Sequence, residues 1–139
     1  MADARKLARI HRVRSLQLGL AQAEELRVRD IAASEAQLSH RIAQLAAAVA
    51  PAPRADGAVT LAAAAHYRDR LHRSAESATN RVRAAEAEAA RAAEATRSAK
   101  RDQSAVEKLL ARAEADAALR AIRALQDAPP VRKIRHDPC

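Results

Sequence analysis

Apolar residues recur at alternating steps of three and four along the second half of the chain, from Leu61 to Ala117. Only Arg68, Thr96 and Gln103 interrupt this series, and its spacing never changes. A repeat that averages about 3.5 residues per turn is typical of a helix that packs along the seam of a left-handed coiled coil. The predicted seam consists of Leu61, Ala64, Arg68, Leu71, Ala75, Ala78, Val82, Ala85, Ala89, Ala92, Thr96, Ala99, Gln103, Val106, Leu110, Ala113 and Ala117.

Alanine fills most of this seam, so a second helix has to approach closely and supply larger side chains. The first half of the chain contains such residues. Between Leu38 and Val49 they are spaced by four, three and four, whereas from Leu7 onward the first steps are all three. We therefore expect a change of register between residues 23 and 29. The apolar residues of this helix are Leu7, Ile10, Val13, Leu16, Leu20, Leu26, Val28, Ile31, Leu38, Ile42, Leu45 and Val49.

Proline and glycine mark the ends of the two helices. Pro51 and Pro53 cannot donate backbone hydrogen bonds and end the first helix, and Gly57 allows a turn. Pro129 and Pro130 end the second helix. The sequence therefore predicts a helix over about residues 4–49, a turn over 50–59, a helix over about 60–127 and a basic, disordered tail over 128–139.

Two long helices joined by a short turn form an all-α antiparallel coiled-coil hairpin, which would make residues 1–127 a single domain. With the turn centred at about residue 55, large side chains of the first helix would face alanines of the second. Leu45, for example, would lie opposite Ala64. The first helix would end opposite Val106, and the longer second helix would continue as a C-terminal overhang.

Two surfaces are expected at the end of the hairpin that bears both chain ends. In the overhang the second helix stops being rich in alanine, and its large apolar residues need a partner. That partner is another protein, a second copy of the chain, or the first helix if the hairpin is kinked. The first residues are strongly basic, which suggests an acidic partner surface. The predicted partner-binding residues are Arg5, Arg9, Arg12, Val106, Leu109, Leu110, Leu119, Ile122 and Leu125.

The composition argues against catalysis. The chain has no Phe or Trp and a single Tyr, so a pocket lined with aromatic side chains for a small-molecule substrate is not expected. No two of the five histidines are four residues apart, the helical spacing for sharing a metal ion, and there is no glycine-rich phosphate loop. We expect no catalytic residues, no cofactor and no metal site, and hence no enzyme.

The net charge of +8 comes from basic residues that are interspersed with acidic ones, as on solvated helix faces. No aromatic or glycine-rich platform accompanies the charge, so a nucleic-acid partner is not expected. The single cysteine, Cys139, cannot form an internal disulfide. The sequence shows neither a signal peptide nor an apolar run long enough for a membrane span, which predicts a cytoplasmic protein.

The chain resembles FliJ, the flagellar export protein, and its type III secretion counterparts. The resemblance covers nearly the whole chain and is carried by RKLARIHRVRSLQ near the start and by KRDQSAVEKLLARAEADAALRAIRALQD, with VEKLLAR at Val106–Arg112. It implies an antiparallel two-helix coiled coil that binds the hexameric flagellar export ATPase through the end bearing both termini. It also implies contacts with the export-gate membrane protein and with export chaperones, at the cytoplasmic face of the membrane.

Two other classes of function remain open beside the one that this resemblance implies. The first is a structural or scaffolding coiled coil that self-associates through the overhang, and it predicts a defined dimer in solution. The second is a basic nucleic-acid binder, which predicts salt-sensitive retention on DNA.

Overall fold

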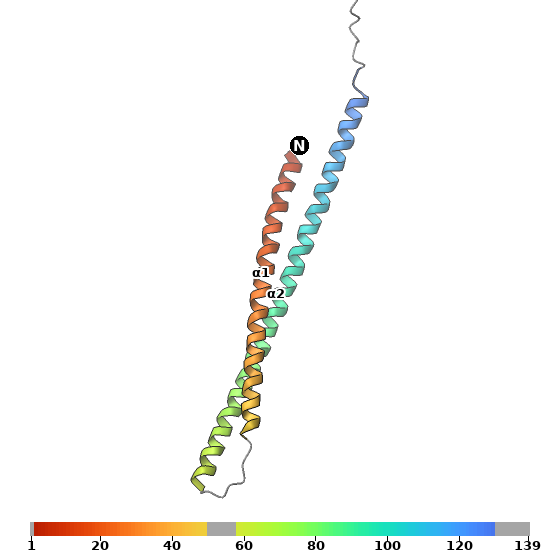
Figure 1. The fold of residues 1–139 in the computed structure, drawn as a ribbon. Helices are drawn as coiled ribbons and strands as arrows, with labels where there is room; N and C mark the ends of the chain where they lie inside the picture. The colour runs from red at the N-terminus through yellow and green to blue at the C-terminus, as the bar shows by residue number, and fades with distance from the viewer. Residues whose placement is uncertain (1, 50–57, 130–139) are drawn as a thin grey trace, which may run out of the picture. The chain divides into compact units, whose positions relative to one another are not determined.

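Two long helices make up the chain. The computed structural model describes residues 2–49 and 58–129, and all regular secondary structure in these ranges is α-helix. Helix α1 spans Ala2–Ala48 and α2 spans Ala58–Gln126, with 47 and 69 residues, and the two pack against each other (Figure 1). The predicted all-α fold is confirmed, and each helix end lies within two residues of its predicted position. Most of the predicted turn and tail lies outside the described residues.

The helices pair within two compact units. Unit 1 combines Met1–Ser15 with Arg101–Cys139, and unit 2 consists of Leu16–Lys100. Each unit therefore contains one segment of α1 beside one segment of α2 (Figure 1). The N-terminal and C-terminal residues of the described chain belong to unit 1, which is the part that the predicted partner-binding residues occupy.

The covered face of α2 follows the predicted seam. From Ala64 to Ala113 every seam position is partly or fully covered, and Ala78 is completely buried. The two end positions of the predicted series are not covered. Leu61 is 66% exposed, and Ala117 is also exposed. The seam prediction is thus confirmed from Ala64 to Ala113. Alanines suit this face because they allow the backbone of α1 to approach closely.

The covered face of α1 keeps the same alternation of three and four along its whole length. The predicted change of register between residues 23 and 29 is wrong. The unbroken series on α2 sets the register, and α1 holds it by placing polar side chains such as Glu25 and Glu35 at covered positions. The series is Ala4, Leu7, His11, Arg14, Leu18, Ala21, Glu25, Val28, Ala32, Glu35, Ser39, Ile42, Ala46 and Val49.

Most large apolar side chains of α1 lie outside this covered face. Leu20 is 72% exposed and Leu45 is 56% exposed, so the prediction that they face alanines of α2 is wrong. Val28 and Ala78 are the only buried hydrophobic residues among those described. The core of the helix pair is therefore narrow, and it consists mainly of small or partly covered side chains.

A contact in unit 2 shows that the facing positions of the two helices also differ from the prediction. Arg81 Nε donates a hydrogen bond of 3.1 Å to Glu35 Oε2. The predicted pairing would place Ser74 opposite Glu35, one heptad earlier on α2. The predicted pairing assumes that α2 packs on α1 from its first residues, whereas Leu61 is 66% exposed.

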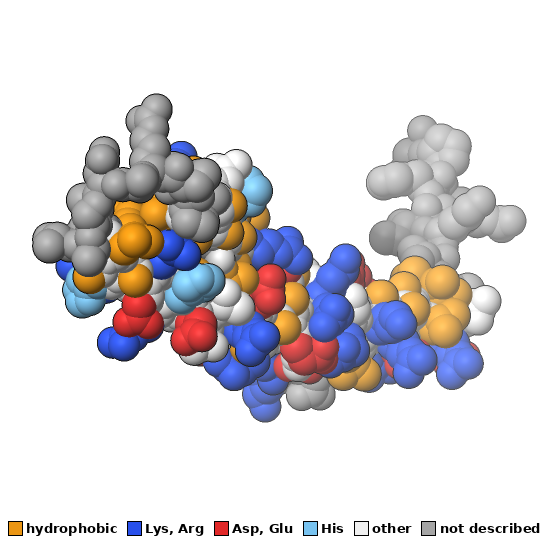
Figure 2. All heavy atoms as spheres, turned by 90° about the horizontal axis from the view of Figure 1, so that it is seen from below, with side chains coloured by type: hydrophobic (Ala, Val, Ile, Leu, Met, Phe, Trp, Pro, Cys, Tyr) orange, Lys and Arg blue, Asp and Glu red, His pale blue; other side chains and the backbone are white. Residues whose placement is uncertain are grey.

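Ion pairs along each helix support the exposed faces. Ion pairs at a spacing of three or four residues include Glu24 with Arg27 at 2.6 Å, Glu25 with Arg29 at 2.5 Å, Asp69 with Arg73 at 2.8 Å, Glu94 with Arg97 at 2.9 Å, and Glu88 with Arg91. Each exposed pair of this kind stabilises a helix by only about 0.2–0.5 kcal/mol. Figure 2 shows one face of the molecule, on which basic side chains lie among acidic and hydrophobic ones.

Candidate functional site

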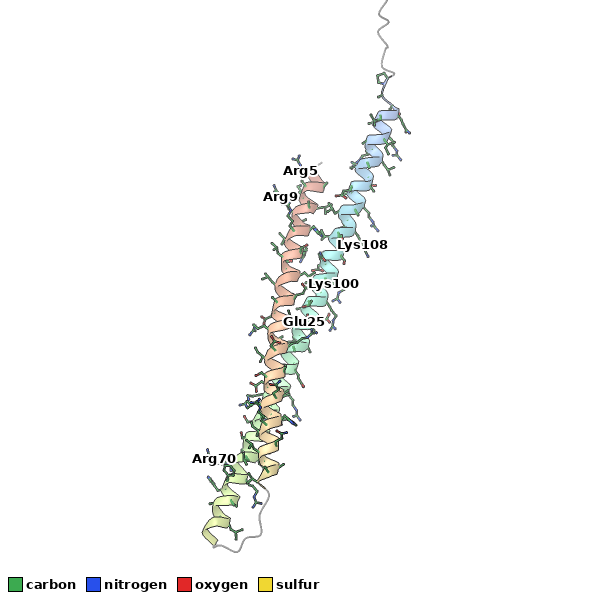
Figure 3. All side chains as sticks on the ribbon, viewed as in Figure 1. Arg5, Arg9, Glu25, Arg70, Lys100 and Lys108 are labelled. Carbon is green, nitrogen blue, oxygen red and sulfur yellow. The ribbon has the colours of Figure 1, made fainter. Side chains whose placement is uncertain are left out.

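The start of α1 presents a basic surface in unit 1. Arg5, Arg9 and Arg12 follow one another at steps of four and three, which places them on one side of the helix, and all three are exposed. Figure 3 shows the side chain of Arg9 pointing away from α2. None of the three has an ion-pair partner among the described residues. Their guanidinium groups are therefore exposed, and the acidic partner that the sequence suggests for them stays a prediction.

Polar contacts fix this part of α1 against α2. Arg14 Nη1 lies 3.2 Å from Asp102 Oδ2, and Gln103 Nε2 donates a hydrogen bond of 3.4 Å to Ser15 Oγ. The interruption of the predicted seam at Gln103 thus corresponds to a contact between the two helices. His11 also lies on the covered face, and its buried Nε2 has no hydrogen-bond partner among the described residues.

The uncovered end of α2 begins later than the sequence predicts. Val106 and Leu110 are partly covered, so the prediction that they belong to the overhang is wrong. Leu109 is 48% exposed, and every described residue after Ala113 is exposed. The facing positions are shifted by one heptad, and this shift brings the start of α1 further along α2. The overhang that remains is residues 114–126.

Three large apolar residues stand on one side of this overhang. Leu119 is 52% exposed, Ile122 is 51% exposed and Leu125 is 77% exposed. At about 100° per residue, their steps of three keep them within an arc of about 120°. That arc lies opposite Ala113, the last covered position of α2, so it points away from the face that packs on α1. We name these three residues the apolar triplet.

Basic side chains border the apolar triplet. An open depression on this stretch of α2 is lined by Asp116, Leu119, Arg120 and Arg123. Arg120 Nε donates a hydrogen bond of 3.2 Å to the backbone oxygen of Asp116, which holds the arginine along the helix. This surface therefore combines apolar area with positive charge, and the start of α1 contributes further positive charge to unit 1.

The described part of the chain offers little to a small ligand. Among the described residues, no group of three His, Cys, Asp or Glu side chains could hold a metal ion. Neither described helix is long and apolar enough to cross a membrane. The arrangement in unit 1 suits contacts with another macromolecule, because it consists of exposed side chains on helix surfaces.

Comparison with known proteins adds no relative. No protein-family model matches the chain, and neither a curated protein nor a solved structure matches it.

Proposed function

We propose that the protein is a non-enzymatic component of the flagellar protein export apparatus that binds the ring of the hexameric export ATPase. The observation that carries this proposal is the composition of unit 1. In this unit the exposed apolar triplet of α2 and the exposed arginines at the start of α1 belong to one compact body. A protein that seats in a ring needs an end of this kind, with apolar anchors and a charged border.

The proposal includes an antiparallel coiled-coil hairpin as the fold. The segment 49–57 spans at most about 30 Å when fully extended. The 47 residues of α1 extend over about 70 Å. Because so short a segment cannot return alongside α1, two helices that pack together along their lengths run in opposite directions. The alternating spacing of covered positions on both helices supports knobs-into-holes packing.

The proposed mechanism is a shift of an assembly equilibrium. The helix pair binds the assembled hexamer and not the separate ATPase subunits, so by mass action it favours the assembled and active ring. No residue of this protein takes part in ATP hydrolysis. The turn end of the proposed hairpin, near residues 50–67, faces the export-gate membrane protein, and export chaperones are further partners at the cytoplasmic face of the membrane.

Asp substitutions in the apolar triplet test the proposal. The L119D/I122D variant should lose stimulation of the export ATPase from the same source, because two charges would enter an apolar contact. Ala124→Asp is the matched control, since it adds a charge to the same exposed stretch but on the opposite side. The A124D variant should stimulate like the wild type. Equal loss in both variants, or no loss in either, would exclude the apolar triplet as the ATPase contact.

A variant at Leu110 separates a contact residue from a structural one. Leu110 is partly covered on the face of α2 that packs on α1. Leu110→Asp should therefore lower the helicity and the melting temperature, whereas L119D/I122D should leave both unchanged. Circular dichroism of the two variants checks this difference before any ATPase assay.

A further inference from the structure

A second series of apolar residues follows the outside of α1 in unit 2. Its large members are Leu20, Ile31, Leu38 and Leu45, which are 72%, 43%, 43% and 56% exposed. Glu24 and Arg27 lie between the first two, so the steps from Leu20 to Ile31 are four, three and four. We name this series the outer stripe. Its apolar members are 11, 7 and 7 residues apart, which keeps them on one side of the helix, and no helix of the described chain covers them.

The outer stripe is richer in large side chains than the face that α1 buries. Val28 is the only buried hydrophobic residue of α1 among the described residues, whereas each large member of the outer stripe is more than two-fifths exposed. A helix with one apolar series needs one neighbour, and a second series with the same spacing specifies a second helical neighbour. The spacing therefore identifies the occupant as an α-helix.

The order of residues at the centre of the stripe identifies which helix that is. Read from Leu20 to Ile31, the order is apolar, acidic, basic, apolar, with spacing that is the same in both directions. In an antiparallel pair of identical helices centred between Glu24 and Arg27, each Glu24 faces Arg27 of the second copy. Each Leu20 then faces Ile31, and each Gln17 faces Ser34. Over these central positions apolar residues thus meet apolar ones, and opposite charges meet.

The in-register parallel pair and the two neighbouring antiparallel registers lack this match. A parallel pair would place Glu24 against Glu24 and Arg27 against Arg27. A shift of one heptad in one direction would place Leu20 against Glu24, and in the other direction it would place Arg27 against Ile31. A two-fold contact repeats every pair, so each mismatch would occur twice. The charge pattern therefore favours the antiparallel register centred between Glu24 and Arg27 over these three arrangements.

We propose that two copies of the chain associate through the outer stripes of their α1 helices, antiparallel, with Leu20 of each copy opposite Ile31 of the other. Glu24 and Arg27 are accessible for this contact, because their side chains are 52% and 62% exposed. Within one copy Arg27 Nε already donates a 2.8 Å hydrogen bond to Glu24 Oε2. The dimer would extend this pair into a network of four charges. This surface lies in unit 2, and the proposed ATPase contact lies in unit 1, so the two proposals stand independently.

The first test measures the molar mass of the full chain over a range of concentrations by sedimentation equilibrium. The wild type should approach twice the 14.9 kDa mass of one chain. Leu20→Asp should raise the dissociation constant by about tenfold or more, because the contact of Leu20 with Ile31 is lost at both of its occurrences in the dimer. Leu26→Asp is the matched control, because Leu26 is also exposed, at 63%, but lies outside the stripe. The L26D variant should dimerise like the wild type.

The second test does not depend on how the L20D variant folds. In a Cys139→Ser background, the chain carries no other cysteine. The L20C and I31C variants should not cross-link alone under oxidation, whereas an equimolar mixture should, because only the mixed dimer brings two thiols together. Leu26→Cys, mixed with either variant, should not cross-link.

Three results would overturn the proposal. The first is a single-chain mass at every concentration, which would leave the stripe to a helix of another protein. The second is dimerisation that L20D and L26D affect equally. The third is cross-linking of L20C with itself and not with I31C, which would show a parallel pair. ATPase stimulation plays no part in these readouts, so failure here leaves the proposed function untouched, and failure of the proposed function leaves the dimer untouched.

Discussion

Glu24 and Arg27 form an exposed ion pair on α1, and it shifts the pKa values of both groups. The hydrogen bonds and the charge of the Arg27 guanidinium lower the pKa of Glu24, and Glu24 raises the pKa of Arg27. A carboxyl with a lowered pKa in the folded state stabilises that state above its unfolded pKa. This contribution is lost as the pH falls through the folded pKa.

Replacement of Arg27 tests this pair at the scale of single residues. In Arg27→Gln, the pKa of Glu24 should rise toward its ordinary value, as measured by NMR titration of the side-chain carboxyl carbon. The variant should melt slightly below the wild type at neutral pH, and this difference should disappear once the pH is low enough to protonate Glu24 in both proteins. An unchanged Glu24 titration would show that the hydrogen bonds do not form in solution.

Polar residues at covered positions show what a sequence can and cannot reveal about single sites. The interruptions at Thr96 and Gln103 were recognisable, because they stand in an otherwise regular apolar series on α2. Thr96 Oγ1 donates to the backbone oxygen of Ala92 at 3.1 Å, and Gln103 contacts Ser15. The covered polar residues of α1, such as Glu35, were not recognisable, because a polar side chain in a helix normally faces solvent.

At the scale of elements, Gly19 is a weak point of α1. It lies in the helix interior, and a Cβ built on it meets nothing within 4 Å. Glycine in a helix interior costs about 0.5–1 kcal/mol relative to alanine because of its backbone freedom in the unfolded chain.

Gly19→Ala should therefore stabilise the protein by about 0.5–1 kcal/mol. Urea denaturation followed by circular dichroism at 222 nm, a standard helix signal, measures this change at fixed protein concentration. A destabilised variant would mean that another helix lies against this position in solution.

The two helices were not equally predictable, and the reason is physical. On α2 a single long series of small residues marks one side of the helix, so the covered face from Ala64 to Ala113 followed from spacing alone. On α1 two series of apolar residues compete. The larger side chains, including Leu38 and Leu45, belong to the series that stays exposed, so their spacing led to the wrong face. The residues for which the α1 prediction failed lie on the surface that we propose for dimerisation.

At the scale of the whole molecule, the facing register of α1 and α2 lies beyond the reach of spacing. A shift of one heptad returns every residue to the same face, so the pattern of apolar residues does not distinguish the two pairings. For this reason spacing places Val106 and Leu110 on the covered face of α2 but does not show how far α1 extends along α2, so it does not show that these two residues lie before the overhang.

The basic start of α1 should contribute to ATPase binding through long-range attraction. Arg9→Glu should weaken binding and slow association, and the difference from the wild type should shrink as salt screens the charges. Arg70→Glu is the matched control, because Arg70 is equally an exposed arginine but lies in unit 2 (Figure 3). Surface plasmon resonance at two salt concentrations distinguishes the variants. Equal weakening by R9E and R70E would show an effect of net charge only.

The most direct test of the proposed function is a titration of the export ATPase from the same source with this protein. The rate of ATP hydrolysis should rise and saturate at about one copy of this protein per ATPase hexamer, as expected for a ligand that binds only the assembled ring. Absence of both binding and stimulation, with the protein helical and monodisperse, would contradict the proposed function.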